Sequence, residues 1–432
     1  MKQPTFSILI PTSGRADLIA MAVKSILDQT FRDFEIVIAD LSGTEEVRSF
    51  EKSDSRIRYV FAPEGGLTTW DVAAKHAEGK YILWLDDDNY LLPFALDLFK
   101  RTIDRTHADI VSATHLYYYD RAHPRHYLRN NIGVVPFTGA THSLDPKKAL
   151  EGIYAFARRG TGAPLPRFHF SATAVSRDVI QRAIRRLGFV LVTDVPNIHS
   201  LQPIVFAFAE SCAFVDWPVV IVGRLGVSMS QGWSTKARER FRKKAFLPRL
   251  SPVHGYTRIN GVLENLLRVR ELLPDRLGAI PVNYERFAGL YARELMYLDT
   301  ELVTAVRNWR EFFTFIETFP PEPRARLQRE ARKLRRRTPL VLIARRLGLH
   351  HFWRAVFSRV RTARRNRTSP RERMAHNQEF EIPIRERYHV NSIEDLARHI
   401  REIVLDQTGC DIASRPHVAG ENADENVRKS HS

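Results

Sequence analysis

The sequence of 432 residues has little cysteine: only Cys212 and Cys410, which lie far apart. This excludes a disulfide framework and the usual zinc or redox spacings, and it indicates a reducing compartment. No stretch approaches the roughly 20 apolar residues of a membrane-spanning helix, and residues 11–15 interrupt the first apolar run too early for a signal peptide. No internal repeat has solenoid spacing. We therefore expect a cytoplasmic protein, soluble or peripheral on the inner membrane face, long enough for two domains.

Three adjacent acids, Asp86, Asp87 and Asp88, follow the apolar run at residues 81–85 and precede Asn89. Such a run is typical of a buried strand. Carboxylates crowded at the end of a buried strand repel one another and resist desolvation, so a bound divalent cation explains them best. Hard oxygen ligands favour Mn²⁺ or Mg²⁺, and these ions in turn favour a diphosphate. The alternative is a solvated acidic turn.

Strand-like and helix-like segments alternate before this motif. Apolar runs at residues 6–10, 34–39 and 57–61 predict strands, and periodic patterns between them predict helices. The alternation predicts an α/β fold whose mostly parallel sheet is flanked by helices. Ligands of such sheets bind beyond the carboxyl ends of the strands. Thr12, Asp40 and the acids all follow strand ends, so we expect them to meet at one edge.

With this pattern in place, residues 5 to about 235 resemble a family 2 glycosyltransferase of the GT-A fold, of the bacterial polysaccharide-biosynthesis type. Four segments in order carry the resemblance: SILIPT at 7–12, SILDQTFRDFE at 25–35, AEGKYI at 77–82 and DDDN at 86–89, with Pro93 after them. The resemblance implies a Rossmann-like GT-A domain over residues 1–235. It also implies sugar transfer from a nucleoside diphosphate sugar to a glycan or lipid-linked saccharide acceptor.

The resemblance implies roles for the matching positions. Six residues would bind the donor nucleotide and one would contact Mn²⁺ or Mg²⁺: Pro11, Thr12, Arg15, Asp40, Asp86 and Asp87 for the nucleotide, and Asp88 for the metal. The family often has two adjacent acids where this chain has Asp40 followed by Leu41, which leaves the nucleobase open. The metal would neutralise the charge that develops on the departing diphosphate.

An inverting transfer also needs a carboxylate to take the proton of the attacking hydroxyl. Residues 168–172 resemble the segment that precedes this base in the family, and Asp194 is the acid placed best after it. A strict alignment would instead place Asn197 there, and an amide cannot act as a base. Glu210 and Asp216 are fallback candidates. Asp194 could also be a helix cap or a turn residue.

Helical patterns dominate after residue 235. Residues 258–273 and 283–304 carry apolar stripes that predict core faces of helices. We assign residues 236–365 to a helical, strongly basic region. Residues 366–432 are assigned to an exposed linker, a short helix at 392–406 and a disordered tail. Ser392 and Asp395 are spaced for a capping box at the start of that short helix.

Positive charge is concentrated in residues 321–373, where 18 Lys or Arg oppose three Glu and give a net +15, against +17 for the whole chain. Residues 349–360 place Phe352, Trp353 and other apolar side chains on one helical face. Three interpretations remain open. The helix packs on its own domain, or residues 339–365 bind an anionic membrane surface. Nucleic acid is the least favoured partner, since zinc spacing and stacking motifs are lacking.

Two functions of different class compete at this point. The first is a metal-dependent, inverting glycosyltransferase in cell-surface polysaccharide synthesis, which the intact acidic motif favours. The second is a catalytically altered GT-A scaffold or binding module that acts through its basic helices at a membrane or nucleic acid, which Leu41 and Asn197 favour. A nucleotidyl- or phosphosugar transferase would use similar metal chemistry but fits the order of strands and helices less well.

Overall fold

The computed structural model describes residues 3–63, 68–123, 128–157, 168–190, 200–226, 248–255, 257–296, 302–346, 369–370, 380–384 and 388–412. Asp194, Asn197 and most of the predicted membrane-binding segment 339–365 lie outside these residues. So does the tail from Ser414, which the sequence predicts to be disordered.

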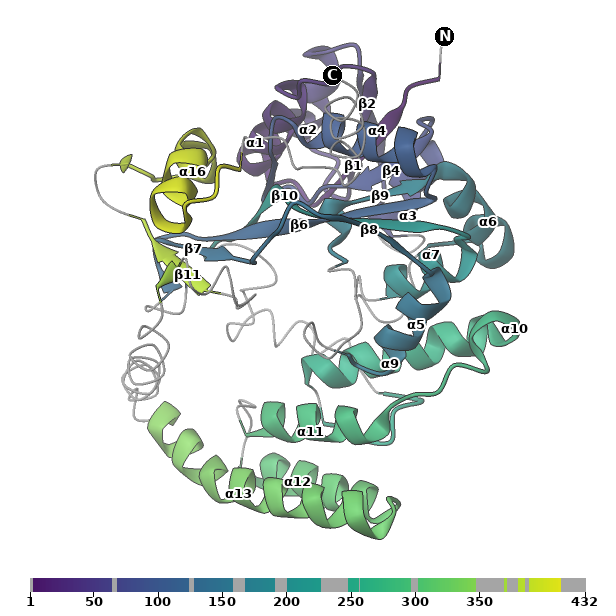
Figure 1. Cartoon of the computed structure of the whole chain (residues 1–432), viewed down its shortest axis with the longest axis vertical. Coiled ribbons are helices and arrows are strands. Elements are labelled where there is room, and N and C mark those ends of the chain that lie inside the picture. The colour runs from purple at the N-terminus through teal and green to yellow at the C-terminus, as the bar shows by residue number, and fades with distance from the viewer. Residues whose placement is uncertain are drawn as a thin grey trace, which may run out of the picture.

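One sheet organises the chain (Figure 1). Its main path is β11-β7-β6-β9-β4-β1-β2-β3, and β10 pairs with β5, β6 and β8 beside that path. The strands are β1 (Phe6–Thr12), β2 (Phe34–Asp40), β3 (Ile57–Phe61), β4 (Tyr81–Trp84), β5 (Asn89–Leu91), β6 (Ile110–Tyr119), β7 (Asn131–Val134), β8 (Thr141–Leu144), β9 (Thr173–Ser176), β10 (Cys212–Arg224) and β11 (Phe380–Pro383).

The predicted α/β GT-A fold class is confirmed, but the sheet is mixed rather than mostly parallel. Strands β1, β2, β3 and β4 pair in parallel, because helical crossovers return the chain to the same end of the sheet each time. Beyond β4, β9 runs antiparallel to both β4 and β6, and β7 and β11 continue antiparallel. The segments that join these later strands reverse the chain direction.

Helices cover both faces of the sheet, and their apolar residues form two cores. One core receives α1 (Ala16–Leu27) and α4 (Ala95–Thr106), and the other receives α3 (Thr69–His76), α5 (Pro146–Tyr154), α6 (Arg177–Leu187) and α7 (Leu201–Phe208). Short helices are α2 (Glu45–Arg48), η1 (Ser49–Lys52) and η3 (Phe170–Ala172). Cys212 is buried in the second core, and burial raises the pKa of its thiol to about 12. The thiol is therefore a core group.

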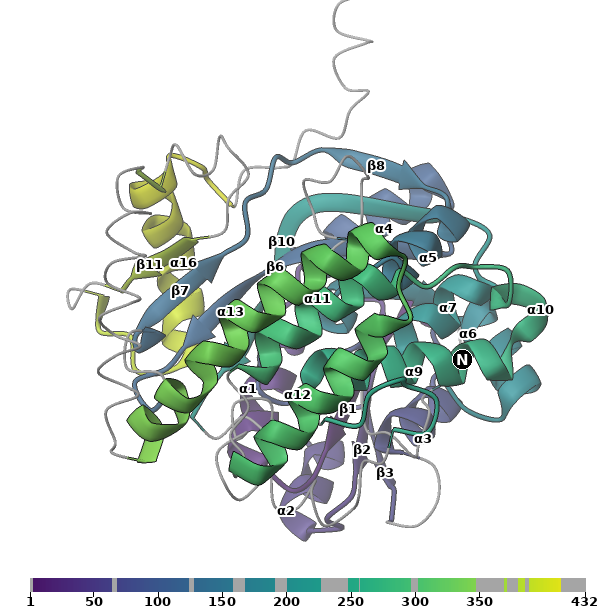
Figure 2. The same ribbon diagram turned by 90° about the horizontal axis from the view of Figure 1, so that it is seen from below.

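The predicted helical region extends the second core away from the sheet (Figures 1 and 2). It contains α9 (Arg258–Leu272), α10 (Pro274–Leu277), α11 (Tyr284–Leu295), α12 (Leu302–Glu317) and α13 (Pro321–Arg346). The helix predicted over residues 283–304 is observed as α11, with a new helix starting at Leu302. Among the residues that the structure describes, we find no helix whose length and apolar character would let it cross a bilayer.

A buried carboxylate anchors the start of this region. Glu264 on α9 accepts hydrogen bonds from the backbone N–H groups of Arg249 at 3.0 Å and of Leu250 and Ser251 at 2.9 Å. Arg268 Nε donates to it at 2.7 Å. Burial raises the pKa of Glu264, but these hydrogen bonds outweigh burial and leave the pKa below its ordinary value of 4.5. The carboxylate therefore stabilises the fold in its ionised form.

Replacing Glu264 by Gln should lower the free energy of unfolding by about 3 kcal/mol at pH 7, since three backbone N–H groups and Arg268 then lose the negative charge of their common acceptor. A native pKa below the unfolded value gives stability that is present above pH 4.5 and is lost as the pH falls through the native pKa. The difference between wild type and variant in urea unfolding should thus shrink below pH 4.5. A difference that is the same at pH 7 and pH 3 would contradict this, and the exposed Glu317→Gln is the control.

The C-terminal segment returns to the sheet. Strand β11 pairs with β7, and α16 (Ile393–Thr408) packs five apolar residues into the first core: Ile393, Leu396, Ile400, Ile403 and Val404. Trp217 Nε1 donates to the carbonyl of Ile412 at 3.1 Å. The capping box of Ser392 and Asp395 is confirmed. The prediction of an exposed linker is wrong for residues 380–383, because this short segment pairs with β7 as a strand and buries Ile382.

Candidate active site

Three parallel strands end at one edge of the sheet. Thr12 at the end of β1 is in register with Asp40 at the end of β2, and β1 also pairs with β4, whose chain continues into the acids at 86–88. The predicted meeting of these strand ends is therefore observed. The structure brings together Pro11, Thr12, Arg15, Asp40, Asp86, Asp87 and Asp88.

Asp87 ties the loop after β1 to the acidic loop. Its carboxylate is 1% exposed and accepts from Thr12 Oγ1 at 2.8 Å and from Arg15 Nε at 3.0 Å. Arg15 Nη2 pairs with the second oxygen. Burial raises the pKa of Asp87, and the charge of Arg15 limits that rise. Asp87 is therefore engaged with protein donors, and it fixes Arg15, whose side chain is 29% exposed, at the edge of the site.

Asp40 accepts hydrogen bonds from the loop that directly follows it. The fully buried carboxylate accepts from the backbone N–H groups of Ser42 and Gly43, both at 2.9 Å, and from Tyr59 Oη at 3.3 Å. This turn also packs against the first loop, since a Cβ on Gly14 would lie 2.8 Å from Ser42 Cβ. Asp40 thus shapes the pocket edge, and its contact with a nucleoside stays a prediction.

Asp86 and Asp88 form the crowded part of the cluster. Desolvation raises the pKa of Asp86 well above 3.8, and repulsion from Asp88 and Asp87 adds to the rise, while Arg15 and Arg224 oppose it. Asp88 is only 7% exposed. Such crowding fits a cation. Within the described residues no group of three or more His, Cys, Asp or Glu side chains could hold a metal alone. Mg²⁺ commonly takes one or two carboxylates together with substrate phosphates.

A clamp of three residues holds the acidic loop from behind. The fully buried Asn89 donates from Nδ2 to Ser171 Oγ at 2.8 Å, and its Oδ1 accepts from Gly223 N at 3.0 Å. A Cβ built on Gly223 would lie 2.0 Å from the carbonyl oxygen of Asp88. Only a glycine lets the end of β10 approach the acidic loop so closely. Ser171 and Gly223, which come much later in the sequence, thus help to position the three acids.

Arg224 is a site residue that the sequence analysis missed. It ends β10, its guanidinium lies 4.8 Å over the ring of Tyr117, and its charge lowers the pKa of Asp86. The rule that marks polar residues after apolar strands would have found it, because it follows the apolar run at 219–223. Of the fallback bases, Asp216 accepts a hydrogen bond from Thr138 Oγ1 at 2.9 Å, and the exposed Glu210 pairs with Arg182. Asp194 lies outside the described residues, so its role as base stays a prediction.

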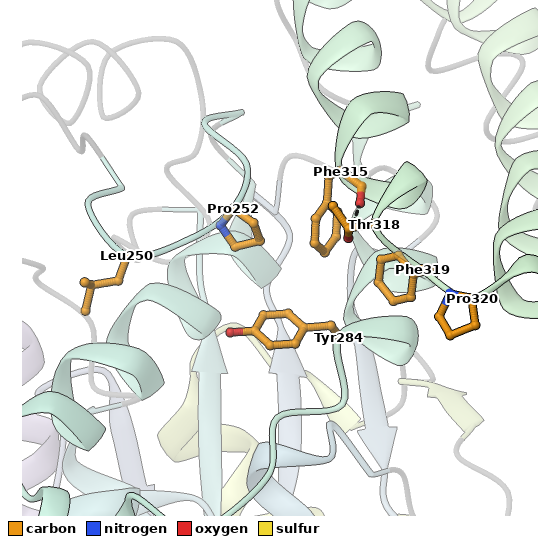
Figure 3. A pocket seen from close by; sticks show the side chains of 7 residues that line it. All are labelled: Leu250, Pro252, Tyr284, Phe315, Thr318, Phe319 and Pro320. Carbon is orange, nitrogen blue, oxygen red and sulfur yellow. Dashed lines mark hydrogen bonds between the residues drawn. The ribbon is translucent and has the colours of Figure 1, made fainter.

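A pocket of about 340 Å³ lies elsewhere, in the helical region (Figure 3). Leu250, Pro252, Tyr284, Phe315, Thr318, Phe319 and Pro320 line it. Thr318 turns its hydroxyl onto the carbonyl of Phe315 at 2.7 Å, as the dashed line shows. The lining offers no carboxylate, so this pocket lacks the groups that diphosphate or proton-transfer chemistry requires.

Comparison with known proteins finds a family match for the N-terminal part of the chain. Residues 7–182 match Glycosyl transferase family 2. Over this segment the chain is similar to members of that family. A 117-residue stretch is 30% identical to the GalNAc(5)-diNAcBac-PP-undecaprenol beta-1,3-glucosyltransferase of Campylobacter jejuni, over 25% of this chain and 37% of that protein. A 93-residue stretch is 32% identical to the putative teichuronic acid biosynthesis glycosyltransferase TuaG of Bacillus subtilis, over 20% of this chain and 37% of that protein.

These matches cover little more than a third of either relative's length. Among solved structures, S. aureus TarS in complex with UDP-GlcNAc has a TM-score of 0.47 and 14% identity, over 80% of this chain and 92% of that chain. The family 2 match ends before β10, β11 and α16, yet these elements pair with or pack on the same sheet.

Proposed function

We propose that the chain is a metal-dependent, inverting glycosyltransferase. It moves a sugar from a nucleoside diphosphate sugar to a glycan or lipid-linked saccharide in cell-surface polysaccharide synthesis. The observation that carries the proposal is the acid cluster after β4, where Asp86, Asp87 and Asp88 lie close together at the edge of the sheet, within the segment that matches family 2. The names of the relatives, one of which acts on a PP-undecaprenol-linked glycan, support this class of acceptor.

The described residues have distinct roles in this proposal. Asp88, with Asp86 beside it, would hold Mn²⁺ or Mg²⁺, which when bound neutralises charge on the departing diphosphate. Arg15, fixed by Asp87, provides a positive charge at the same edge, and Thr12 together with the Asp40 loop forms the nucleoside side of the site. Asp194 is proposed as the base that takes the proton of the acceptor hydroxyl.

A thermal-shift screen tests the donor site. Purified protein is heated with nucleoside diphosphates and their sugars, with and without Mn²⁺. A ligand that binds only the native state adds about 2.7 kcal/mol to the free energy of unfolding at a concentration of 100 times Kd. The melting temperature rises as a result. We expect one nucleotide class to shift the melting temperature only when metal is present. Nucleoside monophosphates and Mn²⁺ alone are the controls. The absence of any metal-dependent shift would contradict the proposal.

We also propose that α13 attaches the protein to an anionic membrane surface. Its buried residues Leu327, Ala331 and Thr338 face the helical core. The opposite side exposes five basic residues: Arg329, Arg332, Lys333, Arg336 and Arg337. A helix that packs on its own domain thus still presents a basic face to a surface. Each such charge contributes about 1 kcal/mol near anionic lipid.

Changing Arg332, Lys333, Arg336 and Arg337 together to Gln should therefore weaken sedimentation with phosphatidylserine vesicles at least tenfold, at unchanged melting temperature. Phosphatidylcholine vesicles are the control surface. Equal sedimentation of variant and wild type would refute the attachment. Loss of vesicle binding on addition of RNA at physiological salt would instead favour nucleic acid as the partner.

A further inference from the structure

Strand β6 carries a row of aromatic rings at its carboxyl end. His115, Tyr117 and Tyr119 occupy alternate positions, and alternate residues of a strand share one face. Their ring centroids are 4.7 Å apart for the first pair and 6.2 Å for the second. Gly133 on β7 lies opposite Tyr117, and a Cβ there would come within 3.1 Å of both tyrosine side chains. Because Gly133 has no side chain, the rings of Tyr117 and Tyr119 can occupy the space beside β7.

Polar and cationic groups surround the aromatic row. His169 lies 4.8 Å from His115, and His123 lies 5.1 Å from Tyr119, measured between ring centroids. Arg224 covers part of Tyr117. His115 and His123 are buried and support the row, whereas Tyr117 and Tyr119 retain exposed surface. Tyr117 packs in part against the first core, and the row is also bordered by His169, His123 and Arg224, which are hydrogen-bonding or charged groups.

The aromatic row adjoins the acid cluster. Arg224, stacked on Tyr117, is close enough to lower the pKa of Asp86, and the preceding Gly223 packs against the carbonyl of Asp88. The strand order β6-β9-β4-β1-β2 places the acids after β4 between the nucleoside edge on β1 and β2 and the aromatic row on β6. An attacking hydroxyl must reach the sugar from the side opposite the departing diphosphate. The row lies on that side of the acids.

We propose that the aromatic row is a subsite that stacks a pyranose ring of the acceptor saccharide, a proposal that rests on the proposed function. The C–H-rich face of a pyranose packs on the negative face of an aromatic ring. Tyrosine hydroxyl and imidazole groups then fix the sugar hydroxyls, as polar groups do in largely aromatic ligand sites. Arg224 connects the two halves of the site, because it stacks on this subsite and faces the acids.

The test uses saturation-transfer NMR of the full chain with methyl glycosides of hexoses and N-acetylhexosamines. We expect saturation of pyranose C–H protons by the wild type. The signal should fall at least fivefold in Tyr117→Ala and in Tyr119→Ala, and should be retained in Tyr117→Phe, which keeps the ring. The melting temperature and the metal-dependent donor shift of each variant verify that the fold and the donor site are intact.

Two outcomes would overturn the subsite: full saturation in both alanine variants, or no saturation of any methyl glycoside at millimolar concentration by the wild type. Failure of the proposed function has a different signature, namely saturation by the wild type with no donor shift. That result would leave a saccharide-binding site without transfer.

Discussion

Replacing Asp88 by Asn should reduce sugar transfer at least about 100-fold, which corresponds to about 2.7 kcal/mol of transition-state stabilisation. The amide keeps the size of the side chain but removes the charge that would hold the metal near the diphosphate. Loss of electrostatic stabilisation of this kind commonly has an effect of that size. The protein should stay folded, because the change also removes repulsion with Asp86.

The measurement is transfer from the donor identified by the thermal-shift screen, together with the metal-dependent shift itself, which should vanish. Asp104→Asn is the matched control, since this exposed acid on α4 pairs with Lys100 away from the site. Unchanged transfer in Asp88→Asn would remove this residue from the metal site. An equal loss in Asp104→Asn would point to a general defect in the variants.

Replacing Gly223 by Ala should be the most destabilising single methyl addition in the described part of β10. The new Cβ would lie 2.0 Å from the carbonyl oxygen of Asp88, so either β10 or the acidic loop must move. Over-packing of this kind lowers the free energy of unfolding by about 3 kcal/mol. The hydrogen bond from Gly223 N to Asn89 would be strained by the same movement, and metal-dependent donor binding should be lost with it.

Gly289→Ala provides the control, because a Cβ at this position on α11 meets nothing within 4 Å. Alanine in a helix should raise stability there by about 0.5–1 kcal/mol. The free energies of urea unfolding of Gly223→Ala and Gly289→Ala thus compare the same added methyl group at a crowded position and at an open one. A Gly223→Ala protein as stable as wild type, with normal donor binding, would show that the clamp does not position the acids.

Local patterns carried much of the fold and part of the site. The run at 81–85 and the acids after it predict a strand and a cluster because burial and charge are properties of adjacent residues. Thr12, Asp40 and Asp87 meet as expected, because strand ends of a parallel sheet share an edge. The salt bridge of Arg15 with Asp87 joins residues far apart in sequence, and no local pattern announces such a pair.

Long-range pairing explains what the sequence patterns did not reveal. Gly223 and Asn89 contact each other only because β10 inserts beside β5. From the sequence alone, Tyr117 and Tyr119 are typical of a buried strand. Only the pairing with β7 shows that Gly133 leaves room for their rings. Strand β11 has only four residues and forms its strand hydrogen bonds with β7. A run this short gives no strand pattern of its own, so the sequence predicts a linker there.

The return of the C-terminal segment to the sheet sets an order for assembly during synthesis. Residues 6–224 leave the ribosome first and contain all strands of the described sheet but one. Helix α16 packs into the first core, which contains Trp217, and Ile412 accepts a hydrogen bond from Trp217; both are translated after α13. Almost 170 residues are therefore added after β10 before the nascent chain contains the apolar residues that α16 packs into this core. A stop codon anywhere in that interval would release a protein that has the acid cluster at the edge of the sheet but lacks the apolar residues of α16 in the first core.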